Sequence, residues 1–233
     1  MPFKKIFRAA TKIISAPIKI ISKALSWLSP KVDVPDFGTT DFDDFEKGIL
    51  LNKQSNDASI PVIYGTRLVG GTRVFMETSG TDNTYLYMAI VLSEGEINGI
   101  TEIRVDDKVV TFASSLADNT AVEVGSSDSN FYKNSASLIR LEPHFGSDGQ
   151  SASSLLSTLS SWGSNHKLSG LAYLAIRFTW NQDAFTGIPK VQAKVQGRKI
   201  VTLNSSLVES SATFSANPAF CLLDYLRNER YGK

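Results

Sequence analysis

Residues 171–180 read LAYLAIRFTW and residues 190–202 read KVQAKVQGRKIVT, two runs rich in β-branched and aromatic side chains. Such runs, bounded by Gly, Pro, Asn and Asp, are typical of β-strands. Six more runs share the pattern, at 60–64, 67–77, 85–92, 101–105, 108–112 and 137–142. Because many of the connections are too short for a crossover, we expect a mainly β, antiparallel protein of barrel-like or sandwich-like architecture.

The connections carry turn signals of several kinds. Asp106-Asp107 predicts a hairpin turn, and residues 187–189 predict a bend before a strand. Gly70-Gly71 lies inside the run 67–77 and predicts a second hairpin turn. Residues 114–132 are rich in Ser, Asn, Asp and Ala, which indicates surface excursions.

Two accessory helices are expected in the same region of the chain. The first covers 150–161, where three leucines share a face and Ser147 or Asp148 could cap the start. The second covers 217–228, with Asn217 as N-cap and Pro218 at the first helical position. Its buried stripe would be Phe220, Leu223 and Leu226, with Cys221 as a small buried side chain.

Charge divides the 233 residues into a basic arm and an acidic body. Residues 1–31 hold seven Lys or Arg and no acid, whereas the remainder holds 17 basic against 23 acidic residues, a net charge of −6. Residues 32–47 form a linker with one proline, one glycine and six acids. The single cysteine excludes an internal disulfide, and two histidines cannot alone form a multi-histidine metal site.

The arm has the spacing of an amphipathic helix, which Pro17 would kink or break. Charged residues inside its apolar stretch argue against a signal peptide, and its uncharged runs are too short to span a bilayer. A coiled coil, a helix docked on its own body or a neighbouring subunit, and a helix that meets anionic lipid or nucleic acid stay open. The candidate contact residues are the cations Lys4, Lys5, Arg8, Lys12, Lys19 and Lys23 and the apolar Phe3, Phe7, Ile14, Ile21, Trp27 and Leu28.

Patterns that would carry catalysis or ligand binding are incomplete. The glycines of residues 65–72 imitate a phosphate-binding loop, but Gly71 stands where the lysine is required and a strand pattern follows. Asp41, Asp43 and Asp44 imitate half of a calcium loop without its glycine and closing glutamate. His144 and His166 have no recognisable nucleophile and acid in their local sequence. We therefore expect no enzyme activity, no cofactor and no metal.

Four segments together resemble the central hub, or tail-tip protein, of lambda-like siphophages, often called tip attachment protein J. They are SGLAYLAIRFTWNQDAFTGIP (169–189) continuing through VQGRK (195–199), VLSEGEINGI (91–100), PHFGSDGQ (143–150) and NPAFCLLDYLRNERYG (217–232). They occur in the order of that family, and the resemblance extends over roughly residues 48–233.

The resemblance implies β-rich hub domains that form a homotrimer at the distal end of a phage tail. Such a ring would close the tail tube, contact the distal tail protein and the tape measure protein, and open for passage of phage DNA. It implies location in the virion, and also that the chain is the N-terminal part of a longer hub. The implied division is an arm (1–31), a linker (32–47), a first hub β domain (48–112), an inserted or second subdomain (113–168) and returning strands with a helix (169–233).

Two further functions compete with the structural hub. In the first, the arm inserts into the host envelope during ejection, and the body only carries it. In the second, the cations of the arm line a channel for nucleic acid, which the acidic body disfavours.

Overall fold

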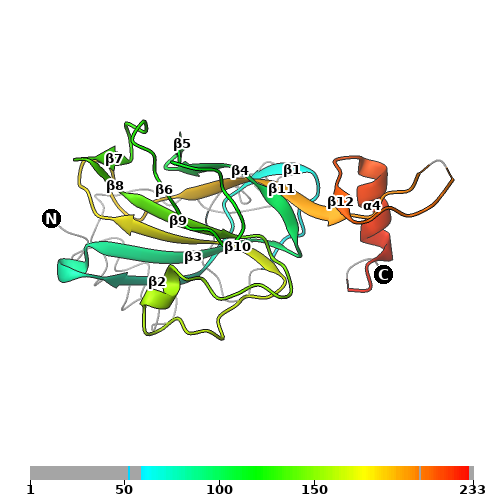
Figure 1. Cartoon of the computed structure of the whole chain (residues 1–233), viewed down its shortest axis with the longest axis horizontal. Helices are drawn as coiled ribbons and strands as arrows, with labels where there is room; N and C mark the ends of the chain where they lie inside the picture. Colours follow the sequence, from blue (N-terminus) through cyan, green and yellow to red (C-terminus); the bar gives the residue numbers. More distant parts are fainter. Residues whose placement is uncertain (1–51, 53–58, 205, 231–233) are drawn as a thin grey trace, which may run out of the picture.

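The computed structural model describes residues 52, 59–204 and 206–230, and the predicted arm and linker lie outside them. All strand pairs between the described residues are antiparallel, and the class is mainly β, as expected. Figure 1 shows the strands as two layers, with the C-terminal helix beyond one end of them.

Two five-stranded sheets form the body. The first has the order β1-β11-β4-β5, with β12 also paired to β11, and the second has the order β2-β3-β10-β9-β6. A separate hairpin joins β7 and β8. The strands are β1 (Thr66–Val69), β2 (Thr72–Ser79), β3 (Tyr85–Glu94), β4 (Ile97–Val105), β5 (Lys108–Val109), β6 (Val122–Glu123), β7 (Tyr132–Lys133), β8 (Ala136–Ser137), β9 (Ile139–His144), β10 (Leu171–Thr179), β11 (Val191–Ile200) and β12 (Thr213–Phe214).

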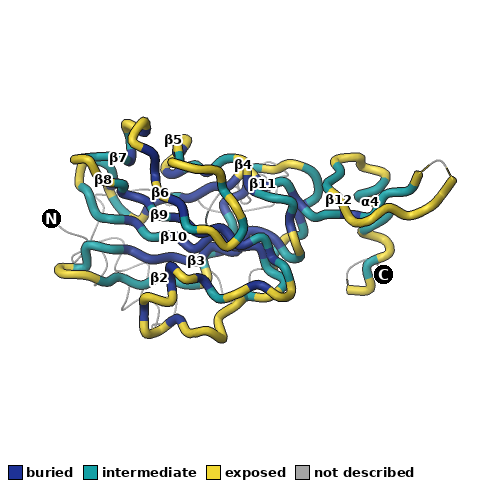
Figure 2. The backbone as a smooth tube through the Cα atoms, in the orientation of Figure 1, coloured by how far each residue is buried: buried dark blue, intermediate teal, exposed yellow. Residues whose placement is uncertain are grey.

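The main core lies between the two sheets. Alternate residues of β3 and β10 point inward, and they pack against the inward residues of β4 and β11. Figure 2 shows the buried residues concentrated along the central strands. Leu174, Ile176 and Ile90 are completely buried there. Each such side chain contributes about 1.5–3 kcal/mol of transfer free energy, so this layer accounts for the pairing of the sheets.

The outer face of the second sheet has its own apolar cluster. Ala89, Tyr173 and Ala175 of this face pack under Leu156 and Trp162 of the segment 146–170, which crosses over the sheet. The segment is closed on itself by the Gln150 side chain, whose Nε2 donates to the carbonyl oxygens of Lys167, Leu168 and Leu171.

The helix expected at 150–161 is wrong. Within it, only η3 (Leu156–Thr158) is helical, as a single 3-10 turn, and Ser147 and Asp148 do not cap it. Serine hydroxyls compete for the backbone groups that a helix would use. Ser157 donates to the Ser153 carbonyl oxygen at 2.6 Å, and Ser153 accepts from the Leu156 amide at 3.2 Å.

The hairpin expected at Gly70-Gly71 is also wrong, because β1 pairs with β11 and β2 pairs with β3, in different sheets. This pair of glycines carries the chain from one sheet to the other. Gly71 has φ +69°, and a Cβ added there would lie 2.5 Å from the carbonyl oxygen of Val91. Only glycine permits this close approach. The second 3-10 turn, η2 (Thr81–Asn83), links β2 to β3.

Two other turn predictions are confirmed. Asp106 and Asp107 have φ +49° and +64° and join β4 to β5 in a tight hairpin. Residues 186–188 bend just before β11. The region 114–132 is less exposed than expected, because Phe131 and Val122 belong to the main core. Buried Asp128 folds that region by accepting from the amides of Asn130 and Phe131.

The C-terminal helix is confirmed as α4 (Pro218–Arg227), and the Asn217 side chain accepts from the Ala219 amide at 3.0 Å. Its predicted burial is wrong. No residue of α4 is buried: Phe220 and Leu223 are half-buried, and Leu226 is 58% exposed. Cys221 is likewise only partly buried.

Candidate functional site

The candidate contact residues of the arm lie outside the described residues, so their role stays a prediction. The calcium-like acids Asp41, Asp43 and Asp44 lie outside them as well. Over the ranges 59–204 and 206–230, the structure shows no group of three or more His, Cys, Asp or Glu that could hold a metal ion. None of the helices in this part of the chain is long and apolar enough to span a bilayer.

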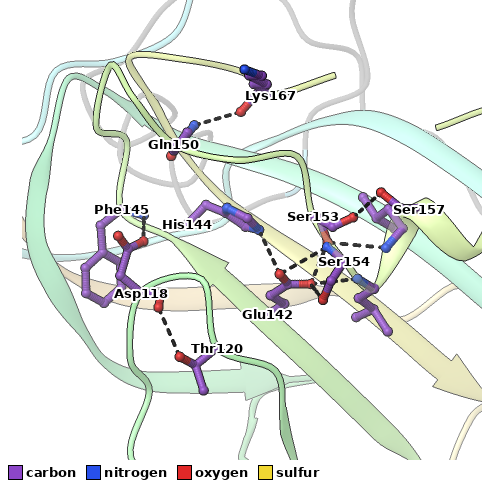
Figure 3. A network of polar contacts seen from close by, with 12 residues as sticks. Asp118, Thr120, Glu142, His144, Phe145, Gln150, Ser153, Ser154, Ser157 and Lys167 are labelled. Atoms are coloured by element: carbon purple, nitrogen blue, oxygen red, sulfur yellow. Dashed lines mark hydrogen bonds and ion pairs between the residues drawn. The ribbon is translucent and has the colours of Figure 1, made fainter. Parts of the chain in front are cut away.

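The most concentrated group of ionisable and hydroxyl side chains surrounds Glu142 of β9, under the segment 146–170 (Figure 3). Oε2 of Glu142 accepts from Ser153 Oγ at 2.7 Å, the Leu155 amide at 2.7 Å and Ser154 Oγ at 3.1 Å. Oε1 accepts from the Ser154 amide at 3.2 Å and lies 3.5 Å from His144 Nε2. The carboxylate thus binds the covering segment to the sheet.

His144 and Tyr173 form the next layer of this network. They are opposite each other on β9 and β10, and their rings stack in parallel with centroids 4.2 Å apart. Neither residue has measurable exposure. His166 has different neighbours, the Trp162 ring and the backbone of Gly163.

Electrostatics keep Glu142 ionised inside the protein. Burial alone would raise the pKa of its carboxyl, but the contacts with His144, the Leu155 amide, Ser153 and the Ser154 amide lower the pKa to about 2. Burial, followed by the charge of Glu142, raises the pKa of the Tyr173 hydroxyl well above its usual range. A buried carboxylate with this many donors is a fixed structural anchor.

The geometry does not match nucleophilic catalysis. In a Ser-His-acid triad the histidine lies between the nucleophile and the acid. Here the carboxylate of Glu142 lies between Ser153 and His144, and both of these residues are completely buried. No substrate could reach this serine without displacement of the covering segment.

The glycine-rich stretch 65–72 does not form a phosphate-binding loop. Thr66–Val69 is β1, and β2 begins directly after Gly71, where a phosphate-binding loop would open a helix. The stretch therefore departs from a phosphate-binding loop both in its sequence, which lacks the lysine, and in its fold, which lacks the helix.

A cavity of about 490 Å³ lies where the two sheets exchange strands, and Gly95, Gly146 and Asp148 line part of it. Its charges are matched within the chain. Lys199 Nζ contacts Glu96 Oε1 at 2.7 Å, and Arg198 Nε contacts Asp224 Oδ2 at 3.2 Å. The two basic side chains of the lining are therefore both paired with acids of the described residues.

The exposed apolar side chains gather toward the C-terminal end. Leu222 and Leu226 of α4 are each 58% exposed, and Leu207 and Val208 of the preceding loop are 77% and 59% exposed. Asp224 holds α4 to the body by accepting from Tyr64 at 2.6 Å and pairing with Arg198. The helix is therefore fixed by polar contacts while its apolar side chains face solvent.

The sequence is 26% identical over 212 residues to the baseplate hub protein pb3 of Escherichia phage T5. The chain resembles a phage baseplate hub protein. This match covers 74% of the chain and 22% of the length of pb3, so the chain spans about a fifth of that relative. A chain of the virion of a native gene transfer agent particle superposes with a TM-score of 0.42 and 16% identity, over 63% of this chain and 29% of that chain. No family model matches the sequence.

The match to pb3 agrees with the coarser part of the resemblance drawn from the sequence, a hub protein of a phage tail. The assignment to the lambda-like group stays a prediction. The network around Glu142 was missed from the sequence, although PHFGSDGQ (143–150) flags its neighbourhood.

Proposed function

We propose that the protein is a structural component of a phage tail and belongs to the hub of its baseplate or tail tip. The observation that carries this proposal is the similarity to pb3, which extends over 74% of the chain. The buried network supports it, because Glu142, Ser153 and His144 are closed to substrates and the bonds accepted by Glu142 stabilise a covering segment. No catalytic step is assigned to the chain.

In detail, three copies form a ring at the distal end of the tail tube. The ring contacts the distal tail protein and the end of the tape measure protein, and it opens for passage of DNA. The exposed apolar side chains of α4 support an assembled state, because apolar side chains clustered on a surface are typical of protein interfaces.

Deletion of the coding gene from the phage tests this function. We expect particles that lack normal tails and infectivity, with both restored by expression of the full-length chain in the host. Particles with complete tails and unchanged infectivity after deletion would contradict the proposal. As a control, the variant Lys108→Gln, which changes an exposed residue of β5, should restore tails as well as the unmodified chain does.

A second candidate function applies to the basic arm alone. The alternation of six cations with six large apolar residues in 1–31 is what binding to an anionic membrane requires. Flotation of the full chain with vesicles of phosphatidylglycerol and phosphatidylcholine tests this function. Binding that disappears when Lys4, Lys5, Arg8, Lys12, Lys19 and Lys23 are changed to Gln supports it, and failure of the unmodified chain to float contradicts it.

A further inference from the structure

A row of polar side chains crosses the outer face of the second sheet. The registers place Glu77 opposite Tyr87, Tyr87 opposite Arg177, Arg177 opposite Arg140, and Arg140 opposite Glu123. Residues directly opposite each other on paired strands point to the same face, with Cβ atoms about 5 Å apart. The row therefore puts Arg140 and Arg177 directly opposite each other on neighbouring strands, with their side chains on the same face of the sheet.

This arginine pair, Arg140 and Arg177, lacks enough counter-charge. Directly opposed like charges destabilise a sheet. Within the described part of the chain Arg140 has one ion pair, a long contact of 3.7 Å from Nη1 to Glu123 Oε1, and both of these side chains are about half exposed. Glu77 lies at the far end of the row, where its carboxylate accepts from Ser161, and Tyr87 separates it from the arginine pair.

Donors of both arginines are left without acceptors. The Nε atoms of Arg140 and Arg177 are buried and have no hydrogen-bond partner in the part of the chain that the structure describes. Arg177 lies over the ring of Tyr85, 5.1 Å from its centroid, which holds the guanidinium in place without neutralising it. Two arginine side chains that share one face of neighbouring strands form a site for carboxylate or phosphate oxygens.

The chain itself contains a matching anionic segment. Residues 33–46 hold six acids and no base, in the sequence DVPDFGTTDFDDFE. Because this acidic segment is covalently attached to the body, its effective concentration at the arginine pair is far higher than that of a free ligand.

The connection is long enough for the acidic segment to reach the pair. Asn52 is fixed beside the start of β11 and beside Gly70, since its side chain bonds both the amide and the carbonyl of Val191 and the carbonyl of Gly70. The distance from the start of β2 to the row of polar side chains is about 17 Å along the strand. The distance from β2 to β9 is about 14 Å across the sheet. Asn52 comes eight positions after Asp44 and 16 positions after Asp36, and these lengths of chain can span about 27 Å and about 55 Å.

We propose that the acidic segment 33–46 docks on the outer face of its own second sheet, with carboxylates bound to the arginine pair Arg140 and Arg177. Docking relieves the repulsion between the two guanidinium groups by pairing them with carboxylates.

Limited digestion of the full chain with chymotrypsin tests the docking. This protease cleaves after aromatic residues, and the acidic segment contains Phe37, Phe42 and Phe45. The cut sites and their rates are read by mass spectrometry at low salt. Cleavage after Phe3 and Phe7 in the arm provides an internal standard for protease activity.

The expected result is slow cleavage in the acidic segment of the unmodified chain, and cleavage about tenfold faster in the double variant Arg140→Gln/Arg177→Gln, which is the effect of losing about 1.4 kcal/mol of binding. The control variant Lys108→Gln/Lys194→Gln removes two positive charges from the other sheet and should behave like the unmodified chain. Changing Asp36, Asp41, Asp43 and Asp44 to Asn should accelerate cleavage as the arginine variant does.

Three results would overturn the proposal. One is equal cleavage of the acidic segment in the unmodified chain and the arginine variant. Another is protection that falls on dilution of the protein, which would make a second copy the source of the carboxylates. The third is binding of a short DNA duplex that requires both arginines while the acidic segment is cleaved at the same rate in every variant.

Discussion

The carboxylate of Glu142 accepts a 2.7 Å hydrogen bond from the amide of Leu155, thirteen residues further along the chain. This contact joins a strand of the second sheet to the segment that covers it. The same carboxylate binds Ser153 and Ser154. One buried charge therefore determines where the covering segment lies.

Glu142→Gln should lower the free energy of unfolding by about 2–4 kcal/mol. The neutral amide oxygen accepts more weakly than a carboxylate, and the amide NH2 would face the hydroxyl and amide donors that now bind Glu142. Urea denaturation of the purified chain measures this change. Glu123→Gln is the matched control. It removes only a half-exposed pair of 3.7 Å, and a loss within about 1 kcal/mol is expected. Equal losses in the two variants would contradict the role of Glu142.

Stability should fall in acid because of this same group. The folded-state pKa of Glu142, about 2, lies below its ordinary value of 4.5. Its contribution is therefore complete above about pH 4.5 and is lost as the pH falls toward 2, with a total on the order of 3 kcal/mol. Unfolding free energies at pH 6 and pH 2.5 should differ more for the unmodified chain than for Glu142→Gln. Parallel pH profiles would contradict this assignment.

Gly71→Ala should destabilise the fold by about 2–4 kcal/mol, since it combines a left-handed backbone with a steric clash. The added Cβ would lie 2.5 Å from the Val91 carbonyl oxygen. Gly187→Ala is the control, because a Cβ there meets nothing within 4 Å. Thermal unfolding followed by circular dichroism compares the two variants. A Gly71→Ala protein as stable as Gly187→Ala would show that the crossover between sheets is not tight.

Leu226→Ala should leave the stability of the isolated chain within about 0.5 kcal/mol, because this side chain is 58% exposed. Leu174→Ala, at a completely buried position, should cost about 2–5 kcal/mol. Under the proposed hub function, Leu226→Ala should nevertheless reduce incorporation into tails, measured as the copy number per particle. A large loss of stability would mean that α4 packs on the body more tightly than the structure shows.

The strands at 171–180 and 190–202 were predictable because their composition and boundaries are local signals. The Asp106-Asp107 turn was predictable for the same reason. The role of Gly70-Gly71 was not, since local pattern cannot tell whether two consecutive strands pair with each other or enter different sheets. Only the distant partners of β1 and β2 decide this.

The leucine spacing at 150–161 predicts a helix, and the structure does not have one. Leucines on one face occur both in helices and in irregular segments that cover a sheet, so this spacing alone does not distinguish the two. The serines between them decided the outcome, through bonds to Glu142 and to backbone groups. Glu142 and His144 occupy outward positions of β9, which a strand pattern assigns to solvent. Their burial depends on a segment that follows in the chain, so no short motif could indicate it.

Cryo-electron microscopy of intact tails, with the full-length chain carrying a tag large enough to see, tests the central claim most directly. The account predicts tag density at the distal end of the tail tube, in a ring of symmetry-related copies with α4 against a neighbouring polypeptide. Tails of normal length without tag density at that end, in particles that contain no copy of the chain, would contradict it.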